Sequence, residues 1–258
     1  MAKANLVEIF SSVQGEGPYV GVSTLFIRFG GCDLRCGWCD SPHTWKPAER
    51  CRLEQAPGSA EFREVENPIP VEDALAAAEA LGPARHRFAS FTGGEPLLQP
   101  QAVRVLGEAL RVRGPRVLLE THGIATEALG EVIDVVDVVS MDWKLASDVR
   151  REGRRVRDPE ESFHAEHERF LRVALRAPEV IVKVVVTPAS RDEELDELAR
   201  RVASVDPAVT VVIQPVTPFG SARTTPGARQ LLTWTARLQA ELQDVRLIPQ
   251  THKLLGAL

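Results

Sequence analysis

The chain has 258 residues, 44% of them hydrophobic, and a formal net charge of −5. This length and composition suffice for one well-packed domain. The acidic balance argues against nucleic acid as a ligand, because binding to a phosphate backbone normally needs a basic surface. The sequence has no signal-peptide pattern and no apolar run of about 18 residues, so we expect a cytoplasmic protein that makes no use of a membrane.

Strand-like and helix-like stretches alternate along the chain. Strands are predicted at 24–30, 87–92, 116–121, 135–141, 180–187 and 209–214, and helices at 71–81, 101–112, 166–176, 192–202 and 229–242. This alternation predicts an α/β fold in which crossover helices join parallel strands. The periodicity alone is equally compatible with a partial barrel and with an open doubly wound sheet.

Two segments interrupt the alternation. We expect a single domain over residues 1–258, with insertions at about 45–70 and 147–165. The first insertion is predicted to pack near the cysteines described below. The second is rich in arginine, and a solvated loop is favoured there over a patch that binds tRNA or a partner. Its arginines are Arg150, Arg151, Arg154, Arg155 and Arg157.

Three of the four cysteines follow the first predicted strand. Cys32, Cys36 and Cys39 have the spacing C-x3-C-x2-C, which is dense enough for their thiolates to bind one inorganic centre. A four-iron cluster on three cysteines keeps one iron free to bind a further ligand. The alternative is a structural zinc site that Cys51 or His43 completes. On the cysteines alone, both centres remain open.

Polar residues also stand at the ends of other predicted strands, at 92–96, 120–123, 140–144 and 214–215. In parallel α/β folds, functional groups gather at the carboxyl ends of the strands. We therefore expect these residues to form one site together with the cysteines.

The segment Thr-Gly-Gly-Glu-Pro at 92–96 ends the strand after the cysteines. With C-x3-C-x2-C before it, the chain resembles the radical S-adenosylmethionine (SAM) superfamily. The resemblance implies a partial (β/α)6 TIM-like barrel, a [4Fe-4S] cluster on Cys32, Cys36 and Cys39, and SAM as a cofactor. It also implies an external electron donor such as flavodoxin.

The same resemblance implies a set of residues that bind SAM. Gly93 and Gly94 let the backbone approach a ligand closely, and Glu95 offers an acceptor to a cationic amino group. Asp142 and Lys144 are alternatively a surface ion pair of little energetic value. The implied SAM contacts are Trp38, Cys39, Asp40, Gly94, Glu95, Ser140, Asp142, Lys144 and Gln214.

Further motifs concern the substrate. The segment 9–17, which contains Gln-Gly-Glu-Gly, precedes a strand carrying Arg28; Glu-Thr-His-Gly stands at 120–123 and Gln-Thr-His-Lys at 250–253. Together they resemble the 7-carboxy-7-deazaguanine synthase family. That family converts 6-carboxy-5,6,7,8-tetrahydropterin to 7-carboxy-7-deazaguanine with loss of ammonia, in 7-deazapurine (queuosine) biosynthesis.

This second resemblance implies the substrate contacts Val13, Gln14, Gly15, Glu16, Arg28, Thr92, His252 and Leu258. Arg28 supplies a forked cation for the pterin carboxylate. Ser41 is implied to give its hydroxyl to Mg²⁺, and the chain is implied to form a homodimer. Read without the resemblance, 14–17 is a glycine turn, Ser41 a turn or helix-capping serine, and His252 a structural histidine.

Two residues depart from the family pattern. His122 stands where relatives commonly have Asn or Ser, and Cys51 matches no family position and is interpreted as an ordinary thiol. Two other functions stay open: a radical SAM activase of glycyl-radical enzymes, and a non-enzymatic zinc module built on the four cysteines. Gln-Gly-Glu-Gly and the C-terminal Gln-Thr-His-Lys argue against the activase.

Overall fold

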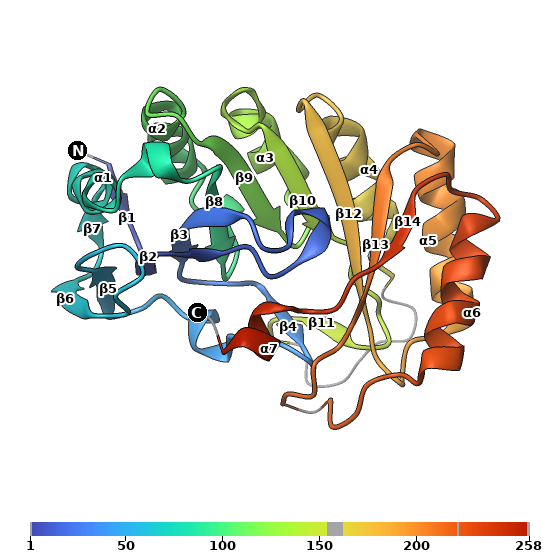
Figure 1. Cartoon of the computed structure of the whole chain (residues 1–258). Helices are drawn as coiled ribbons and strands as arrows, with labels where there is room; N and C mark the ends of the chain where they lie inside the picture. The colour runs from blue at the N-terminus through green and yellow to red at the C-terminus, as the bar shows by residue number, and fades with distance from the viewer. Residues whose placement is uncertain (1, 154–161, 221, 257–258) are drawn as a thin grey trace.

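The computed structural model describes residues 2–153, 162–220 and 222–256. Its main sheet contains β2 (Leu6–Val13), β3 (Ser23–Phe29), β5 (Arg50–Glu54), β6 (Phe62–Glu66), β8 (Phe88–Gly93), β9 (Arg116–Thr121), β10 (Val138–Asp142), β12 (Glu179–Val186), β13 (Thr210–Pro215) and β14 (Val245–Leu247). The strands lie in the order β14-β13-β12-β10-β9-β8-β3-β2-β5-β6 (Figure 1). All six predicted strands are therefore present.

From β3 to β14, neighbouring strands are parallel and follow one another in chain order. The helices beside them are α1 (Val71–Ala80), α2 (Pro100–Arg111), α3 (Thr126–Val132), α4 (His164–Ala174), α5 (Asp192–Val205) and α6 (Ala228–Gln239). A doubly wound sheet reverses its strand order at a switch point, whereas this order advances in one direction. The predicted partial barrel is confirmed, and the open doubly wound sheet is excluded.

The inner face of the barrel is filled at one end and polar at the other. Phe88, Leu118, Val138, Ile181 and Val212 form a buried apolar cluster from five parallel strands. Side chains on one face of a strand recur every second residue. Two residues further along, the same face carries Ser90, Glu120, Ser140, Lys183 and Gln214. The apolar layer closes the interior, so the functional groups gather above it, towards the carboxyl ends of the strands.

The outer face is covered by helices (Figure 1), and a larger apolar core lies between the two layers. Two helices lie outside the predicted set. The first, α3, is only seven residues long and contains Gly130, which weakens its helical pattern. The second, α7 (His252–Leu255), is a single turn near the C-terminus. Within the described ranges, no helix combines the length and apolar character needed to cross a membrane.

The segment predicted as the first insertion is part of the sheet. Its strands β5 and β6 extend the sheet beyond β2, which itself pairs antiparallel with β3. A further strand, β7 (Ile69–Pro70), pairs with β1 (Lys3–Ala4). Only the beginning of the segment packs near the cysteines, where the Cys32 backbone NH donates to the Trp45 carbonyl at 3.2 Å.

The second predicted insertion supports the cysteine loop. Its strand β11 (Val149–Arg151) pairs antiparallel with β4 (Leu34–Cys36), which contains the second cysteine. The Gly37 NH donates to the Asp148 carbonyl, and the Glu152 NH to the Asp33 carbonyl, both at 2.8 Å. This segment was predicted to be a solvated loop; instead it holds the cysteine loop in place. Arg154, Arg155 and Arg157 lie outside the described residues.

Candidate active site

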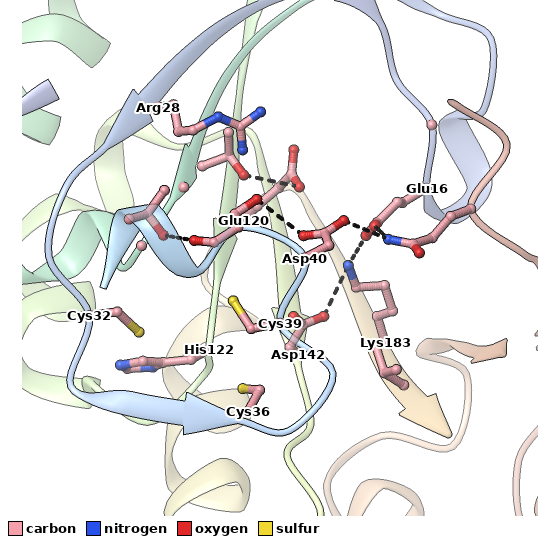
Figure 2. Close-up of a pocket in the computed structure, with 18 of the residues that line it drawn as sticks. Glu16, Arg28, Cys32, Cys36, Cys39, Asp40, Glu120, His122, Asp142 and Lys183 are labelled. Carbon is pink, nitrogen blue, oxygen red and sulfur yellow. Dashed lines mark hydrogen bonds and ion pairs between the residues drawn. The ribbon is translucent and has the colours of Figure 1, made fainter. Parts of the chain in front are cut away.

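A cavity of about 420 Å³ lies at the carboxyl ends of the parallel strands. All the predicted site residues line it except Glu95 and Leu258. Leu258 lies outside the described residues. Figure 2 shows Cys32, Cys36 and Cys39 on one side of the cavity and Arg28 and Glu16 across from them.

The cavity has two parts, a cluster half and a substrate half. The cluster half is lined by the three cysteines, Trp38, Ser140, Asp142, Lys144 and Gln214; the substrate half is lined by Gln14, Gly15, Glu16, Arg28, Glu120 and His252.

The three thiols of the cluster half are free and only partly exposed. Burial raises the pKa of the Cys32 thiol to about 11 and that of the Cys36 thiol to about 12, and the nearby Lys144 ammonium offsets only part of this. Because metals bind the thiolate, binding of a metal centre releases these protons. The fourth cysteine, Cys51, is fully buried in the apolar core on β5 and does not line the cavity.

The arrangement of the thiols fits a cluster better than a single ion. Within the described ranges, no three His, Cys, Asp or Glu side chains are close enough to hold one metal ion. Cysteines that hold a four-iron cluster bind different irons and need not converge on one point. Trp38 Nε1 and Gln214 Oε1 are buried polar atoms for which the described part of the chain supplies no hydrogen-bond partner. Both residues border the cavity, and a polar cofactor such as SAM satisfies atoms of this kind.

An ion pair crosses the floor of the cluster half. Lys144 Nζ lies 2.8 Å from Asp142 Oδ2 and 4.6 Å from the centre of the Trp38 ring. Burial alone raises the pKa of the Asp142 carboxyl, but Lys144 and Lys183 outweigh it and hold this pKa below its usual value. The alternative of an exposed surface pair is therefore wrong, since the Lys144 side chain is only 6% exposed.

Gly94 and Glu95 join neighbouring loops. A Cβ atom on Gly94 would lie 2.1 Å from the Gly31 carbonyl oxygen, so only glycine fits between the β3 and β8 loops. Glu95 is 0% exposed, and its carboxylate accepts hydrogen bonds from Leu97 N, Thr121 Oγ1 and His122 N at 2.8 to 2.9 Å. The prediction gave Glu95 a contact with SAM. In the structure three protein donors bind its carboxylate, which connects the β8 and β9 loops and does not line the cavity.

His122 ties this loop to the cysteines. Its Nε2 lies 2.9 Å from Asp33 Oδ1, and its Nδ1 accepts a hydrogen bond from the Ile124 backbone NH at 3.3 Å. Nδ1 also lies 3.2 Å from Glu95 Oε2, so the ring stands between two carboxylates, Asp33 and Glu95. The bond to His122 is the largest cause that lowers the pKa of Asp33. The residue that departs from the family pattern thus supports the cysteine loop from below.

In the substrate half, the carboxylate of Glu8 orients the side chain of Arg28. Its Nε donates to Glu8 Oε1 at 2.8 Å, and Glu8 Oε2 lies 3.2 Å from an Arg52 terminal nitrogen. This geometry leaves the two terminal nitrogens of Arg28 available to a carboxylate ligand. Gln14 Nε2 donates to Glu120 Oε1 at 3.0 Å, which brings an amide and a carboxylate together deeper in the same half.

The C-terminal segment closes one side of the substrate half. Gln250 Nε2 donates to Glu16 Oε1 at 2.7 Å, and Lys253 Nζ pairs with Asp40 Oδ2 at 2.9 Å. Gly15 lies directly beneath His252, because a Cβ atom on Gly15 would lie 2.0 Å from His252 Nδ1. Burial raises the pKa of Asp40, but the ion pair with Lys253 outweighs this and keeps the pKa below its usual value.

Ser41 faces the cavity beside Asp40. Its hydroxyl donates to Asp40 Oδ1 at 3.1 Å, and although Ser41 precedes a short 3₁₀ turn, its side chain makes no capping bond there. The alternative reading is therefore borne out in part: Ser41 begins a turn, but its side chain does not cap it. The hydroxyl oxygen donates to Asp40 but accepts no hydrogen bond among the described residues, so its lone pairs suit Mg²⁺, which prefers oxygen ligands and retains several waters.

Two inward-facing charged residues were given no ligand in the prediction: Glu120, in the segment 120–123 expected at the site, and Lys183, which was not singled out. Glu120 accepts from Gln14 and, at 2.5 Å, from the Ser90 hydroxyl. Lys183 pairs with Glu16 and Asp142 and is 6% exposed. The signal for Lys183 was present in the sequence, since it is a lone lysine in the run 180–186 of β-branched residues. A charge in a strand buried on both faces requires a buried partner.

A profile of the radical SAM superfamily matches residues 26–202. The 7-carboxy-7-deazaguanine synthase of Geobacter sulfurreducens is 37% identical over 99% of this chain and 98% of its own length. The chain belongs to the 7-carboxy-7-deazaguanine synthase family. The family member of Methanocaldococcus jannaschii is 32% identical over 97% of this chain and 99% of its own length.

A solved structure agrees on the fold. The crystal structure of QueE from Escherichia coli superposes with a TM-score of 0.57 and 22% identity, covering 97% of this chain and 95% of that chain. As a member of the radical SAM superfamily, this 7-carboxy-7-deazaguanine synthase family protein uses a [4Fe-4S] cluster and SAM. Family membership decides against the zinc module and the glycyl-radical activase.

Proposed function

We propose that this protein converts 6-carboxy-5,6,7,8-tetrahydropterin to 7-carboxy-7-deazaguanine with release of ammonia, a step in 7-deazapurine (queuosine) biosynthesis. One observation carries the proposal. A single cavity joins a three-cysteine loop to a guanidinium, an amide and carboxylates that suit a carboxylated pterin, in a chain 37% identical to a relative of this name.

The substrate half supplies complementary groups for each edge of the pterin. Arg28 binds the carboxylate through its free terminal nitrogens, while Gln14, Glu16 and the nearby backbone of Val13 and Gly15 pair with the amino-pyrimidinone edge. Thr92 and His252 complete the contact set among the described residues. Closure by the C-terminal segment limits access of water to the reacting ring.

In the cluster half, Cys32, Cys36 and Cys39 hold the [4Fe-4S] cluster. Trp38, Cys39, Asp40, Gly94, Ser140, Asp142, Lys144 and Gln214 bind SAM, and Glu95 supports them from beneath. Cluster and SAM together supply a one-electron route to hydrogen abstraction from the pterin. The protein's contribution is to hold the pterin at a fixed orientation and distance, which makes the reaction effectively unimolecular.

The test is an anaerobic assay of the reconstituted enzyme with SAM, a reductant, Mg²⁺ and the carboxytetrahydropterin. We expect 7-carboxy-7-deazaguanine by mass spectrometry, and none when SAM is omitted. A tetrahydropterin without the carboxylate is the matched control, because it lacks the group that Arg28 binds. Turnover of this control at the same kcat/KM, or no product from a fully loaded enzyme, would contradict the proposal.

The Mg²⁺ ion is assigned to Ser41, with substrate oxygens and water as its other ligands. Metal-stripped protein should regain activity with added Mg²⁺, and Ser41→Ala should raise the Mg²⁺ concentration required for half-maximal rate. An unchanged Mg²⁺ response in Ser41→Ala would remove Ser41 from the metal site.

Three broader assignments accompany this activity. The protein acts in the cytoplasm, takes its electron from a donor such as flavodoxin and forms a homodimer. Reduced flavodoxin should support turnover without dithionite. Light scattering should give twice the mass of one chain, and a mass near 28.3 kDa would contradict the dimer.

A further inference from the structure

Lys183 is a buried lysine to which the proposed function gives no role. It lies in the middle of β12, where its side chain points into the cavity and is 8% exposed. The flanking Val182 and Val184 are fully buried in the apolar core. A lysine in such a strand loses most of its hydration, so its position must be stabilised by partners inside the cavity.

Those partners are two carboxylates on opposite sides of Lys183. Its ammonium contacts Glu16 Oε2 and lies 3.1 Å from Asp142 Oδ1. Figure 2 shows Lys183 between these two residues. Glu16 follows β2 in the substrate half, whereas Asp142 ends β10 in the cluster half. The lysine therefore forms a direct ionic link between the two halves of the cavity.

Each carboxylate keeps a second partner of its own. Glu16 Oε1 accepts from Gln250 Nε2 at 2.7 Å, and Asp142 Oδ2 pairs with Lys144 at 2.8 Å. Lys183 thus faces the one oxygen of each carboxylate that its other partner leaves free. Its contact with Glu16 is a hydrogen-bonded ion pair, whereas Asp142 Oδ1 is a buried atom with no hydrogen-bond partner among the described residues and is held by the charge of Lys183 alone. Burial lowers the pKa of Lys183, but Asp142, Glu16 and Glu120 outweigh this and raise it, so the amine is charged at neutral pH.

We propose that Lys183 is a positioning residue that fixes the Glu16 carboxylate for the pterin and the Asp142 carboxylate for SAM at the same time, and thereby couples the binding of the two ligands. The inference rests on the proposed function, which assigns Glu16 to the pterin and Asp142 to SAM. A ligand bound in one half fixes the position of Lys183. Lys183 in turn fixes the carboxylate in the other half. Such coupling is reciprocal, because each ligand must change the affinity of the other by the same factor.

Lys144 provides the matched control. It is also a buried lysine paired with Asp142, but its other neighbour is the Trp38 ring rather than Glu16. Lys144→Met should therefore disturb SAM binding alone. Lys183→Met, which keeps most of the length of the side chain and removes the charge, leaves Glu16 Oε2 and Asp142 Oδ1 without the cation that faces them. It should disturb both ligands.

The test measures dissociation constants for SAM and for 6-carboxy-5,6,7,8-tetrahydropterin by anaerobic calorimetry on cluster-loaded protein, each with and without the other ligand. Lys183→Met should weaken each ligand about tenfold, the scale of one lost charged hydrogen bond. Lys144→Met should weaken SAM alone. In the wild type, SAM should change the affinity for the pterin; in Lys183→Met this factor should fall to one.

A merely structural role predicts a different pattern. The inference is overturned if Lys183→Met weakens only one ligand, or if the coupling factor is one in the wild type or unchanged in the variant. If Lys183→Met does not take up the cluster, Lys183→Arg replaces it; its guanidinium spans both carboxylates, so coupling should persist, and loss of coupling there overturns the inference. Failure of the wild type to bind the pterin would instead contradict the proposed function.

Discussion

The two halves of the cavity are held together in different ways. In the cluster half, the cysteines lie within one short loop that β11 and His122 brace through a strand pair and a side-chain hydrogen bond. In the substrate half, Glu16 is held by the amide of Gln250, near the far end of the chain, and by the ammonium of Lys183. The cysteine loop is therefore held largely through its backbone, whereas the substrate half is held by contacts between side chains.

This difference predicts that changes in the cluster half abolish the chemistry and that changes in the substrate half alter recognition. The largest expected effect is that of Cys36→Ser. It should remove the visible absorbance of the cluster and all SAM cleavage, because a serine hydroxyl is a poor replacement for a thiolate ligand. Cys51→Ala is the matched control, since Cys51 is buried away from the cavity. A Cys36→Ser protein with a full iron content would contradict the assignment.

The next effect concerns recognition of the pterin carboxylate. Arg28→Met should lower kcat/KM about 10- to 100-fold, the cost of losing charged hydrogen bonds, while iron content and SAM affinity stay unchanged. Glu8 would still have Arg52 as a partner, so the fold should tolerate the change. Steady-state kinetics with spectroscopic cluster quantification checks this. If Arg28→Met lowered the affinity for SAM by the same factor, Arg28 would serve both ligands and not the pterin alone.

Closure by the C-terminal segment can be disturbed from the opposite side. Gly15→Ala places a methyl group against both the ring and the Cβ of His252, so α7 must move. We expect the KM for the pterin to rise about tenfold, within the usual cost of overpacking, with little change in the SAM dissociation constant. Gly130→Ala, where an added Cβ meets nothing within 4 Å, is the control. Equal KM values for the two variants would show that this segment does not serve recognition.

The smallest effect is on stability and tests the support beneath the cluster half. His167 on α4 donates from Nδ1 to the Gly123 carbonyl and accepts from the Lys144 NH at Nε2, both at 2.8 Å. Burial lowers its pKa well below 6.5. Below about pH 6.5 the unfolded state binds a proton that the folded state rejects, so stability falls with falling pH, by at most about 1.4 kcal/mol per pH unit.

His167→Gln keeps an acceptor for the Lys144 NH and removes the titration. Its urea midpoint should therefore change less than that of the wild type between pH 7.5 and pH 5.5. The carboxylates contribute to both proteins alike, so the difference between the two slopes is the quantity to measure. Identical slopes would mean that His167 does not remain neutral in the fold.

The same difference between the halves explains what the sequence could predict. Six apolar strands and the cysteine loop are contiguous patterns and were recognised, whereas β2, whose apolar residues are interrupted by Glu8, Ser11 and Ser12, was not. The edge strands β5 and β6 were missed because Arg50–Glu54 and Phe62–Glu66 are mostly charged and stand among prolines. Lys183 and Glu120 act through partners far away in sequence, and only the period-two register of the barrel brings them inward. Glu95 was predicted to bind SAM because the motif Thr-Gly-Gly-Glu-Pro places it near the site. The motif does not show which groups its carboxylate contacts.

The bracing of the cysteine loop by β11 also has a consequence for how the protein is made. Arg35, which precedes the second cysteine, pairs with Glu152, 117 residues later. At about 5 to 20 residues per second, a ribosome needs roughly 6 to 23 s to synthesise that stretch. Throughout that interval the newly made thiols lack the strand that orders them and are open to oxidation or to capture by stray metals. If iron and sulfide bind before release from the ribosome, they bind a flexible peptide. If they bind later, they bind a cysteine loop that β11 already holds in place.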